Sequence, residues 1–292
     1  MLIRAGFDMA FDVAAATPML LMLFLHPSRG ATARRPDKIT TEPYIPITTY
    51  IDAFGNQVGR IVAPAGRLRL WNDVIIEDSG QPDSIAADAV QHPVDEVPDD
   101  CVQFLLPSRY CEVDRMVQMA WDLFGRTPPG WARVQAICDW AHSHVEFGYS
   151  YASTSNTAMS VCESGKGVCR DFTHLAVALC RAMNIPARYV TGYLGDIGVP
   201  PVPYPMDFSA WFEVYLSGRW HTFDARHNKP RIGRVLMARG RDAVDVALTT
   251  SFGSTNLQKF VVWTDEVGEN ALSKPPAPVV PTIPPSAPAA SG

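Results

Sequence analysis

The sequence lacks the features that would point to a nucleic acid, a metal ion or a membrane. Its Lys and Arg residues are scattered over 292 residues and the formal net charge is −5, so there is no basic stripe to bind phosphates. It has no Cys-x-x-Cys pair and no compact group of His, Cys and Asp at the spacing of a zinc site. The apolar run from Pro18 to Leu25 is far shorter than the roughly 20 residues that span a bilayer. We therefore predict no nucleic-acid partner, no membrane association, and no metal or cofactor.

Two further absences concern the compartment of the protein. The six cysteines lack the dense spacing of a small disulfide-linked secreted domain, so we expect reduced thiols. The N-terminal segment lacks the uninterrupted apolar core of a signal peptide, because Asp8 and Asp12 fall within it. These observations predict a cytoplasmic protein, and the sequence carries no signal for its oligomeric state.

Alternating hydrophobicity predicts an all-β region over residues 1–98. Residues 3–13 have the period of a half-buried strand, and residues 19–25 form a second strand candidate. Residues 50–63 read as two strands around the turn dipeptide Gly55-Asn56, and residues 68–76 continue the pattern. We expect an antiparallel sandwich or barrel that ends in the Asp- and Pro-rich segment before residue 100.

The pattern changes to helical spacing in residues 99–273. Two amphipathic helices are expected over residues 113–124 and 131–145, and a third begins at Cys169. Strands are expected over residues 187–193, 208–216 and 219–224, with Ser217-Gly218 as the turn between the last two. Helices followed by an antiparallel sheet indicate an α+β fold. The Pro- and Ala-rich residues 274–292 are predicted to form a disordered tail.

Cys169 stands out among the six cysteines because it opens a predicted helix. The segment from Gly165 to Asp171 leads directly into the helical pattern. Unpaired N–H groups and the helix dipole at this position favour a thiolate over a thiol. Cys138 and Cys180 lie inside helical patterns and are expected to be buried. Cys169 is therefore the candidate nucleophile.

Four blocks around this cysteine resemble the bacterial transglutaminase-like superfamily. The resemblance covers roughly residues 111–224, and the all-β first third is similar to the domain that often precedes this core. It implies a papain-like α+β core with a Cys-His-Asp triad, in which Cys169 matches the nucleophile and Asp224 the aspartate. The four blocks are Gly167–Phe172, Ile185–Tyr193, Ser209–Tyr215 and Trp220–Asp224.

The sequence departs from the family at Ser209, which stands where the family usually has histidine before Ala-Trp. Acyl transfer by cysteine needs a group that takes the thiol proton and later protonates the leaving amine, and a serine hydroxyl cannot do this at neutral pH. A two-residue turn at 217–218 would place Ser209 and Asp224 on one face of the sheet as diagonal neighbours. We therefore expect a non-standard site of Cys169, Ser209 and Asp224.

Three histidines are candidates for the missing base. His221 has the opposite strand parity to Asp224, and His174 lies about 140° around the helix from Cys169. His227 also has the wrong parity, but it follows the strand end, where a bend could return it to the site. His227 is therefore the preferred substitute base.

Three further residues are candidates for substrate binding. In the resembling family the tryptophan region also walls the cleft, so Trp211 is a candidate wall residue, and Arg170 and Tyr193 are candidates for its rim. Each also has a structural interpretation: Trp211 and Tyr193 as core aromatics, and Arg170 as a first-turn helix residue. The expected substrate is a small peptide or another amide-bearing molecule.

Three functions are compatible with these residues. The first is a cysteine enzyme that hydrolyses an amide or transfers its acyl group. The second is an isomerase or racemase in which Cys169 and Asp224 move a proton, chemistry that needs no leaving-group protonation. The third is an inactive binding or scaffold protein on the same fold. A substitution introduced at position 209 is a further explanation for the serine.

Overall fold

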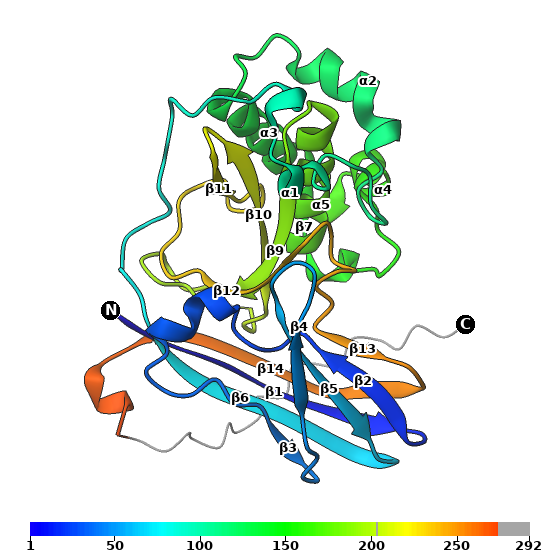
Figure 1. The fold of residues 1–292 in the computed structure, drawn as a ribbon, viewed down its shortest axis with the longest axis vertical. Helices are drawn as coiled ribbons and strands as arrows, with labels where there is room; N and C mark the ends of the chain where they lie inside the picture. Colours follow the sequence, from blue (N-terminus) through cyan, green and yellow to red (C-terminus); the bar gives the residue numbers. More distant parts are fainter. Residues whose placement is uncertain (203, 274–292) are drawn as a thin grey trace.

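The structure, a computed structural model, describes residues 1–202 and 204–273. Within these residues, five α-helices, a four-stranded sheet and a short two-stranded sheet form one half of the molecule, and two further four-stranded sheets form the other (Figure 1). The predicted disordered tail, residues 274–292, lies outside the described residues.

The sheet-rich half is a sandwich of two antiparallel sheets, as the alternating pattern predicts. Apolar side chains from both sheets meet in one core, in which Phe7, Leu21 and Leu70 are fully buried. The first sheet has the order β14 (Thr255–Val267), β1 (Leu2–Val13), β6 (Gly66–Glu77) and β3 (Thr40–Glu42). The second has the order β13 (Thr249–Ser251), β2 (Thr17–Leu21), β5 (Gln57–Ala63) and β4 (Thr48–Ile51).

Strands from both ends of the described chain contribute to this sandwich. Strand β14 pairs with β1 along the whole of β1, from Leu2 opposite Val267 to Val13 opposite Thr255. Strand β13 pairs with β2 in the other sheet. No hydrophobic pattern in the sequence predicted strands in these two segments, and the division at residue 98 stays a prediction. Residues of β13 and β14 also line the cleft that contains Cys169.

Buried Asp8 joins three neighbouring strands of the first sheet. Its carboxylate accepts two hydrogen bonds from Arg69 at 2.9 and 2.8 Å and one from Lys259 at 2.6 Å. These partners lie on β6 and β14, on either side of β1. Desolvation acts to raise the pKa of Asp8, but the two cations outweigh it and the pKa is lowered. An acidic residue in an apolar strand is thus explained by its ion pairs.

The second half is the α+β core that the sequence predicts. Helix α5 (Cys169–Ala182) is buried from Asp171 to Ala182 and packs on strands β9 and β10 and on the other main helices. The helices are α1 (Asp99–Val102), α2 (Val113–Phe124), α3 (Trp131–His144) and α4 (Ala158–Ser164). The sheet has the order β11 (Arg219–Phe223), β10 (Ser209–Leu216), β9 (Ala187–Tyr193) and β12 (Val235–Gly240), and a short parallel pair consists of β7 (Glu146–Phe147) and β8 (Lys166–Gly167).

The hairpin between β10 and β11 has the predicted register. Ser217 and Gly218 both have positive φ, at 47° and 76°, as a tight two-residue hairpin turn requires. Leu216 therefore lies opposite Arg219, and the ladder continues to Phe212 opposite Phe223. This register fixes where Ser209 begins its strand.

Asn56, at the tip of the β4–β5 hairpin, fastens the two halves together. Its fully buried side chain donates to the Arg239 carbonyl at 2.7 Å and accepts the Arg239 N–H at 2.8 Å. It thus pairs with β12 as a neighbouring strand would.

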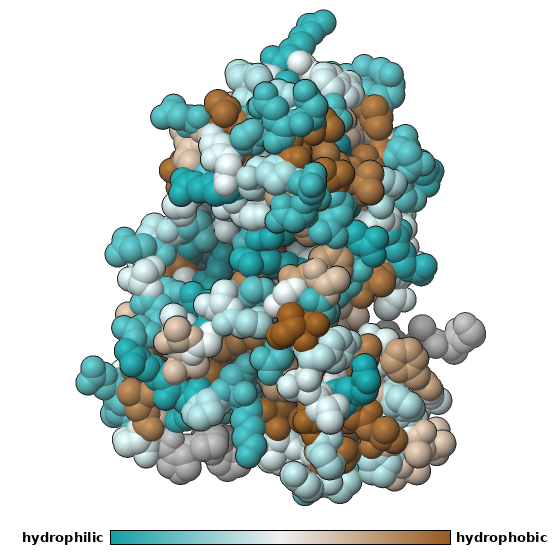
Figure 2. All heavy atoms as spheres, in the orientation of Figure 1, coloured by the Kyte–Doolittle hydropathy of each residue, from teal (hydrophilic) through white to brown (hydrophobic). Residues whose placement is uncertain are grey.

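Within residues 1–202 and 204–273 no helix is long and apolar enough to cross a bilayer. Hydrophobic side chains occur in small groups over both halves of the face in Figure 2, between hydrophilic ones.

Candidate active site

Cys169 is the first residue of α5, as predicted, and the preceding backbone fixes its position. The Asp171 carboxylate accepts the Val168 N–H at 2.9 Å and so caps the helix start. A side chain at Gly167 would bring a Cβ within 2.7 Å of the Asp171 Cβ, so this approach requires glycine. The turn delivers the Cys169 thiol to the junction of the two halves.

The thiol opens into a cleft of about 770 Å³. The core supplies Cys169, Arg170, Ser209 and Ala210 to its lining, together with the 3-10 turn at Tyr149–Tyr151. The sandwich supplies apolar side chains from β1 and β14. These are Met9, Phe11, Leu257 and Phe260. A volume of this size accommodates a peptide-sized ligand.

The Cys169 thiol is protonated at neutral pH in this environment. Burial raises its pKa to about 11, and the negative charge of Asp207 adds to that effect. Arg226 and a hydrogen bond from the Ala210 N–H act in the opposite direction. The expectation of a thiolate from the helix start alone is therefore wrong, because desolvation outweighs the donors. A reaction through Cys169 needs a group that removes the thiol proton.

Ser209 lies in the same cleft as Cys169. It begins β10 opposite Gly192 and is buried. Its hydroxyl oxygen has no hydrogen-bond partner among the residues that the structure describes. An unpaired buried hydroxyl costs stability, and in native proteins such groups gather at functional sites.

Asp224 is held in a separate set of interactions. One carboxylate oxygen accepts the His227 N–H at 2.9 Å, and the other contacts His227 Nδ1 at 2.8 Å and Arg234 at 2.9 Å. Arg234 also pairs with Asp83 at 2.8 Å. Despite its burial, the Arg234 guanidinium and the hydrogen bonds with His227 hold the pKa of Asp224 well below its usual range. We call Asp224, His227, Arg234 and Asp83 the Asp224 cluster.

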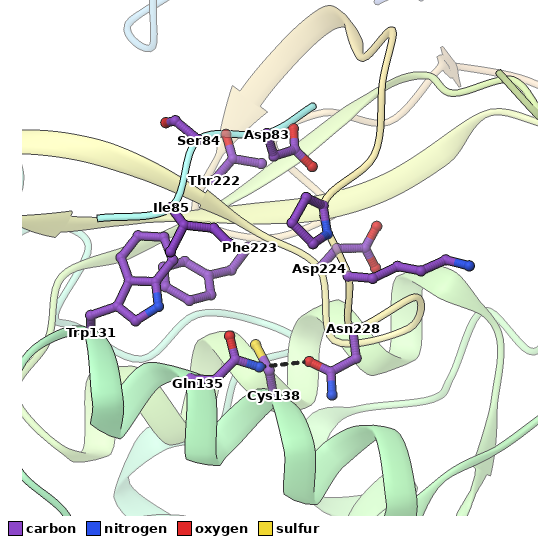
Figure 3. Close-up of a pocket in the computed structure, with 12 residues that line it drawn as sticks. Asp83, Ser84, Ile85, Trp131, Gln135, Cys138, Thr222, Phe223, Asp224 and Asn228 are labelled. Carbon is purple, nitrogen blue, oxygen red and sulfur yellow. Dashed lines mark hydrogen bonds between the residues drawn. The ribbon is translucent and has the colours of Figure 1, made fainter. Parts of the chain in front are cut away.

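The Asp224 cluster borders a second, smaller cavity of about 80 Å³ (Figure 3). Its walls include Trp131 and Cys138 from α3, and a hydrogen bond of 2.9 Å joins Gln135 to Asn228 across it. Since the Ser209 hydroxyl has no partner, no hydrogen bond links it to Asp224. The predicted Cys169, Ser209 and Asp224 site is thus divided between two cavities, with the first two residues in the cleft.

Two of the three predicted substrate-binding residues lie in the core. Trp211 is buried with Val190 and Leu236. Tyr193 is 1% exposed, its ring lies 5.1 Å from that of Phe208, and its hydroxyl has no partner among the described residues. Arg170 does line the cleft, where it pairs with Asp171 and hydrogen-bonds the Ser153 carbonyl.

The three candidate histidines lie in three different environments. His227 is half-buried and hydrogen-bonded to Asp224. His174 is fully buried, accepts the Ala243 N–H at 3.1 Å, and has its pKa lowered by burial. His221 contacts the Leu216 carbonyl at 3.2 Å. His227 as the substitute base stays a prediction.

Comparisons with known proteins agree with this architecture. The sequence profile of the Transglutaminase-like superfamily matches residues 118–225. A solved structure from Cytophaga hutchinsonii, titled a "Putative Cysteine Protease", is 30% identical and has a TM-score of 0.76, over 91% of this chain and 90% of that one. The chain belongs to the transglutaminase-like superfamily. The fold predicted from the four sequence blocks is thereby confirmed.

Two mycobacterial relatives of this transglutaminase-like protein are named as uncharacterized proteins. The Mycobacterium leprae protein ML0607 is 24% identical over 241 residues, which is 77% of this chain and 84% of that protein. The Mycobacterium tuberculosis protein Rv2569c is 30% identical over 142 residues, which is 44% of this chain and 45% of that protein. Their names assign no substrate, so the chemistry must be argued from the site.

The structure of this transglutaminase-like protein also brings three residues to Cys169 that the sequence analysis did not select. Asp207 lines the cleft, and the charges of Asp207 and Arg226 both act on the thiol. Tyr149 lines the cleft too, and the charge of Arg226 acts to lower the pKa of its hydroxyl. One signal was available for Asp207: it lies two residues before Ser209, the spacing that places side chains on one face of a strand. We call the cleft-lining residues Cys169, Asp207 and Ser209, together with Arg226, whose charge acts on the first two, the cleft cluster.

Proposed function

We propose that this protein is a cysteine enzyme that acts on an amide or peptide bond through Cys169. The observation that carries the proposal is the position of the thiol, at the start of α5 and on the wall of a cleft of about 770 Å³. The sulfur attacks the carbonyl carbon, the amine leaves with a proton, and a thioester forms. Water or a second amine then takes the acyl group and restores the thiol.

The cleft lining supports a substrate that is partly apolar. Met9, Phe11, Leu257 and Phe260 come from the sandwich, whereas the thiol and Arg170 come from the core. An apolar surface next to a few polar groups is typical of sites that bind a side chain and orient one reactive bond. The proposed substrate is therefore a peptide or a related small amide, with an apolar group beside the reacting carbonyl.

The test compares the wild-type protein with Cys169→Ala on unfolded casein, with and without dansylcadaverine. New peptide termini indicate hydrolysis of peptide bonds, a gain of 1 Da at glutamine indicates deamidation, and fluorescent casein indicates acyl transfer to the amine. We expect at least one product from the wild type and none from Cys169→Ala. The same products from both proteins would contradict the proposal.

Ser209→His provides a second test of the same proposal. It places an imidazole where the family usually has one, beside a thiol that is protonated at neutral pH. We expect casein turnover to increase if the cleft geometry suits the family reaction. Ser209→Gln, of comparable size without a proton acceptor near neutral pH, is the matched control and should give no increase.

The two alternative functions, an isomerase or racemase and an inactive scaffold protein, predict different behaviour of Cys169 and Asp224. Proton transfer by Cys169 and Asp224 requires both groups to reach one substrate, and the carboxylate of Asp224 is engaged by His227 and Arg234. It predicts solvent deuterium incorporation into a substrate without hydrolysis. A scaffold function predicts that iodoacetamide labels Cys169 no faster than the buried Cys138 and Cys180.

A further inference from the structure

The cleft that contains the Cys169 thiol is also lined by a carboxyl group, that of Asp207. Asp207 and Cys169 line the same cleft and come from different elements, the segment before β10 and the start of α5. One oxygen of Asp207 accepts the Phe208 N–H at 2.7 Å. That is the single hydrogen bond found for this carboxylate among residues 1–202 and 204–273, which leaves its other oxygen available to a proton.

The carboxylate of Asp224 differs from that of Asp207 in how fully it is hydrogen-bonded. Both oxygens of Asp224 are taken, by two contacts with His227 and one with Arg234. A carboxylate held this way serves poorly as a base, because its ion pair with Arg234 and its hydrogen bonds must be given up when it gains a proton. Asp207 lines the same cleft as the Cys169 thiol, its charge acts on that thiol, and it forms no ion pair within residues 1–202 and 204–273.

We propose that Asp207 is the catalytic base of this site, taking the proton of the Cys169 thiol as the sulfur attacks the substrate carbonyl. This inference rests on the proposed cysteine chemistry and names its missing proton acceptor. It assigns to a carboxylate two residues before Ser209 the role that Ser209 itself cannot fill.

The proton and electron movements balance without a cofactor. In the first step the S–H bond breaks, an O–H bond forms on Asp207, the C–S bond forms, and the carbonyl electron pair moves to its oxygen. When the carbonyl re-forms, the C–N bond breaks and Asp207 returns its proton to the leaving amine. Water then adds to the thioester as Asp207 removes its proton, and the departing sulfur takes that proton back.

The charged surroundings of Asp207 suit this exchange. Burial raises the pKa of Asp207 to about 6, with Arg226 and the Phe208 N–H acting in the opposite direction. The groups that face it are Cys169 from α5, Arg226 from the segment after β11, and Tyr149 from the 3-10 turn. Tyr149 stays protonated because burial and the charge of Asp207 raise its pKa. A carboxyl group that titrates near neutral pH can both accept and donate a proton there.

The test measures acetylation of Cys169 by p-nitrophenyl acetate between pH 5 and 8, with the modified cysteine located by peptide mass spectrometry. For the wild type, we expect a rate that rises to about pH 6, with the ionisation of Asp207, and then levels off. For Asp207→Asn, we expect a rate that is lower by about 100-fold at pH 7 and rises tenfold per pH unit, because only free thiolate reacts. Asp207→Glu should restore the plateau, and Asp265→Asn, another carboxyl whose pKa is raised by desolvation, is the control.

The direction of the Asp207→Asn effect separates catalysis from simple electrostatics. The negative charge of Asp207 raises the thiol pKa, so removing a charge that did nothing else would increase the acetylation rate. An equal or faster rate in folded Asp207→Asn would overturn the assignment of Asp207 while leaving the cysteine chemistry intact. A wild-type protein whose Cys169 is never acetylated would instead overturn the proposed function and this inference together.

Discussion

The cleft cluster and the Asp224 cluster contain similar residue types in opposite states. In the Asp224 cluster the carboxylate of Asp224 has a partner on each oxygen, and Arg234 bridges it to Asp83. In the cleft cluster the Ser209 hydroxyl has no partner among the described residues, and burial shifts the pKa values of Cys169 and Asp207 upward. The carboxylate of Asp224 is thus paired on both oxygens, although Nη1 of Arg234 has no hydrogen-bond partner among the described residues. In the cleft cluster the carboxylate of Asp207 has a hydrogen bond to one oxygen, from the Phe208 N–H.

This difference separates residues that hold the fold from residues placed for chemistry. Satisfied buried charges fix the chain, and their loss is felt as instability. Unsatisfied polar groups and perturbed pKa values lower stability, and proteins retain them chiefly where a ligand or a reaction uses them. The comparison therefore predicts that substitutions in the Asp224 cluster destabilise the protein, whereas substitutions in the cleft cluster stabilise it or leave it unchanged.

The largest expected effect is on the Asp224 cluster. Asp224→Ala leaves Arg234 buried with Asp83 as its remaining ion-pair partner, so we expect a loss of about 3–5 kcal/mol in the free energy of unfolding at pH 7. Urea denaturation measures it, with exposed Asp88→Ala as a control that should stay within about 0.5 kcal/mol. The folded pKa of Asp224 is depressed, so its contribution is present above the ordinary pKa and the difference from wild type should narrow in acid. If Asp224→Ala were as stable as wild type, the Asp224 cluster would not be a stabilising part of the fold, and its contrast with the cleft cluster would be wrong.

The next effect has the opposite sign. The folded pKa of Asp207 is raised from 3.8 to about 6, so ionisation of Asp207 opposes folding once the pH exceeds its unfolded value. Asp207→Asn should therefore stabilise the protein by roughly 2–3 kcal/mol at pH 8 and by almost nothing at pH 4. Thermal unfolding at the two pH values measures this difference. Equal stabilisation at both would show that ionisation is not the cause.

His227→Ala tests whether the two clusters act independently. It removes one side-chain contact to Asp224 but leaves Arg234 in place, so we expect a loss of about 1–2 kcal/mol in stability. The pH profile of Cys169 acetylation should keep its plateau, since Asp207 is untouched. Loss of the plateau in His227→Ala, together with its survival in Asp207→Asn, would make His227 the base that the strand-end geometry suggested.

The smallest effect is expected at Ser209. Replacing a buried hydroxyl that has no partner with a methyl group removes an uncompensated desolvation cost, so Ser209→Ala should raise stability by about 1 kcal/mol. The acetylation rate of Cys169 should stay within about twofold of wild type, because serine supplies no proton acceptor. Urea midpoints and the same mass-spectrometric assay measure both quantities. A large loss of rate would show that Ser209 holds the substrate or the base.

Local signals in the sequence account for the parts of the fold that were predicted. Apolar spacing placed α2 over its observed residues, Val113–Phe124, and the residues around Cys169 placed the start of α5. The Ser217-Gly218 turn set the β10–β11 register, because two positive φ angles in a row define a tight hairpin. Each of these depends on neighbours within a few residues.

The missed features depend on contacts between distant residues. Strand β14 is stabilised by pairing with β1 at the other end of the described chain, and no pattern within β14 reveals that partner. The protonated state of Cys169 arises because the sandwich and the core together remove the thiol from water. Asp207 looked like an ordinary residue before a strand, since its raised pKa comes from burial that only the folded cleft creates.

The pairing of β14 with β1 also sets the order in which the protein gains its binding site during synthesis. Strand β1 leaves the ribosome first, and its partner follows only when residue 267 has been added. Leu257 and Phe260 of that late strand belong to the cleft wall. Until it docks, a nascent chain carries Cys169 and Asp207 beside an incomplete pocket and an unpaired edge of β1. The wall of the cleft is therefore completed only after the core that bears the thiol has been synthesised.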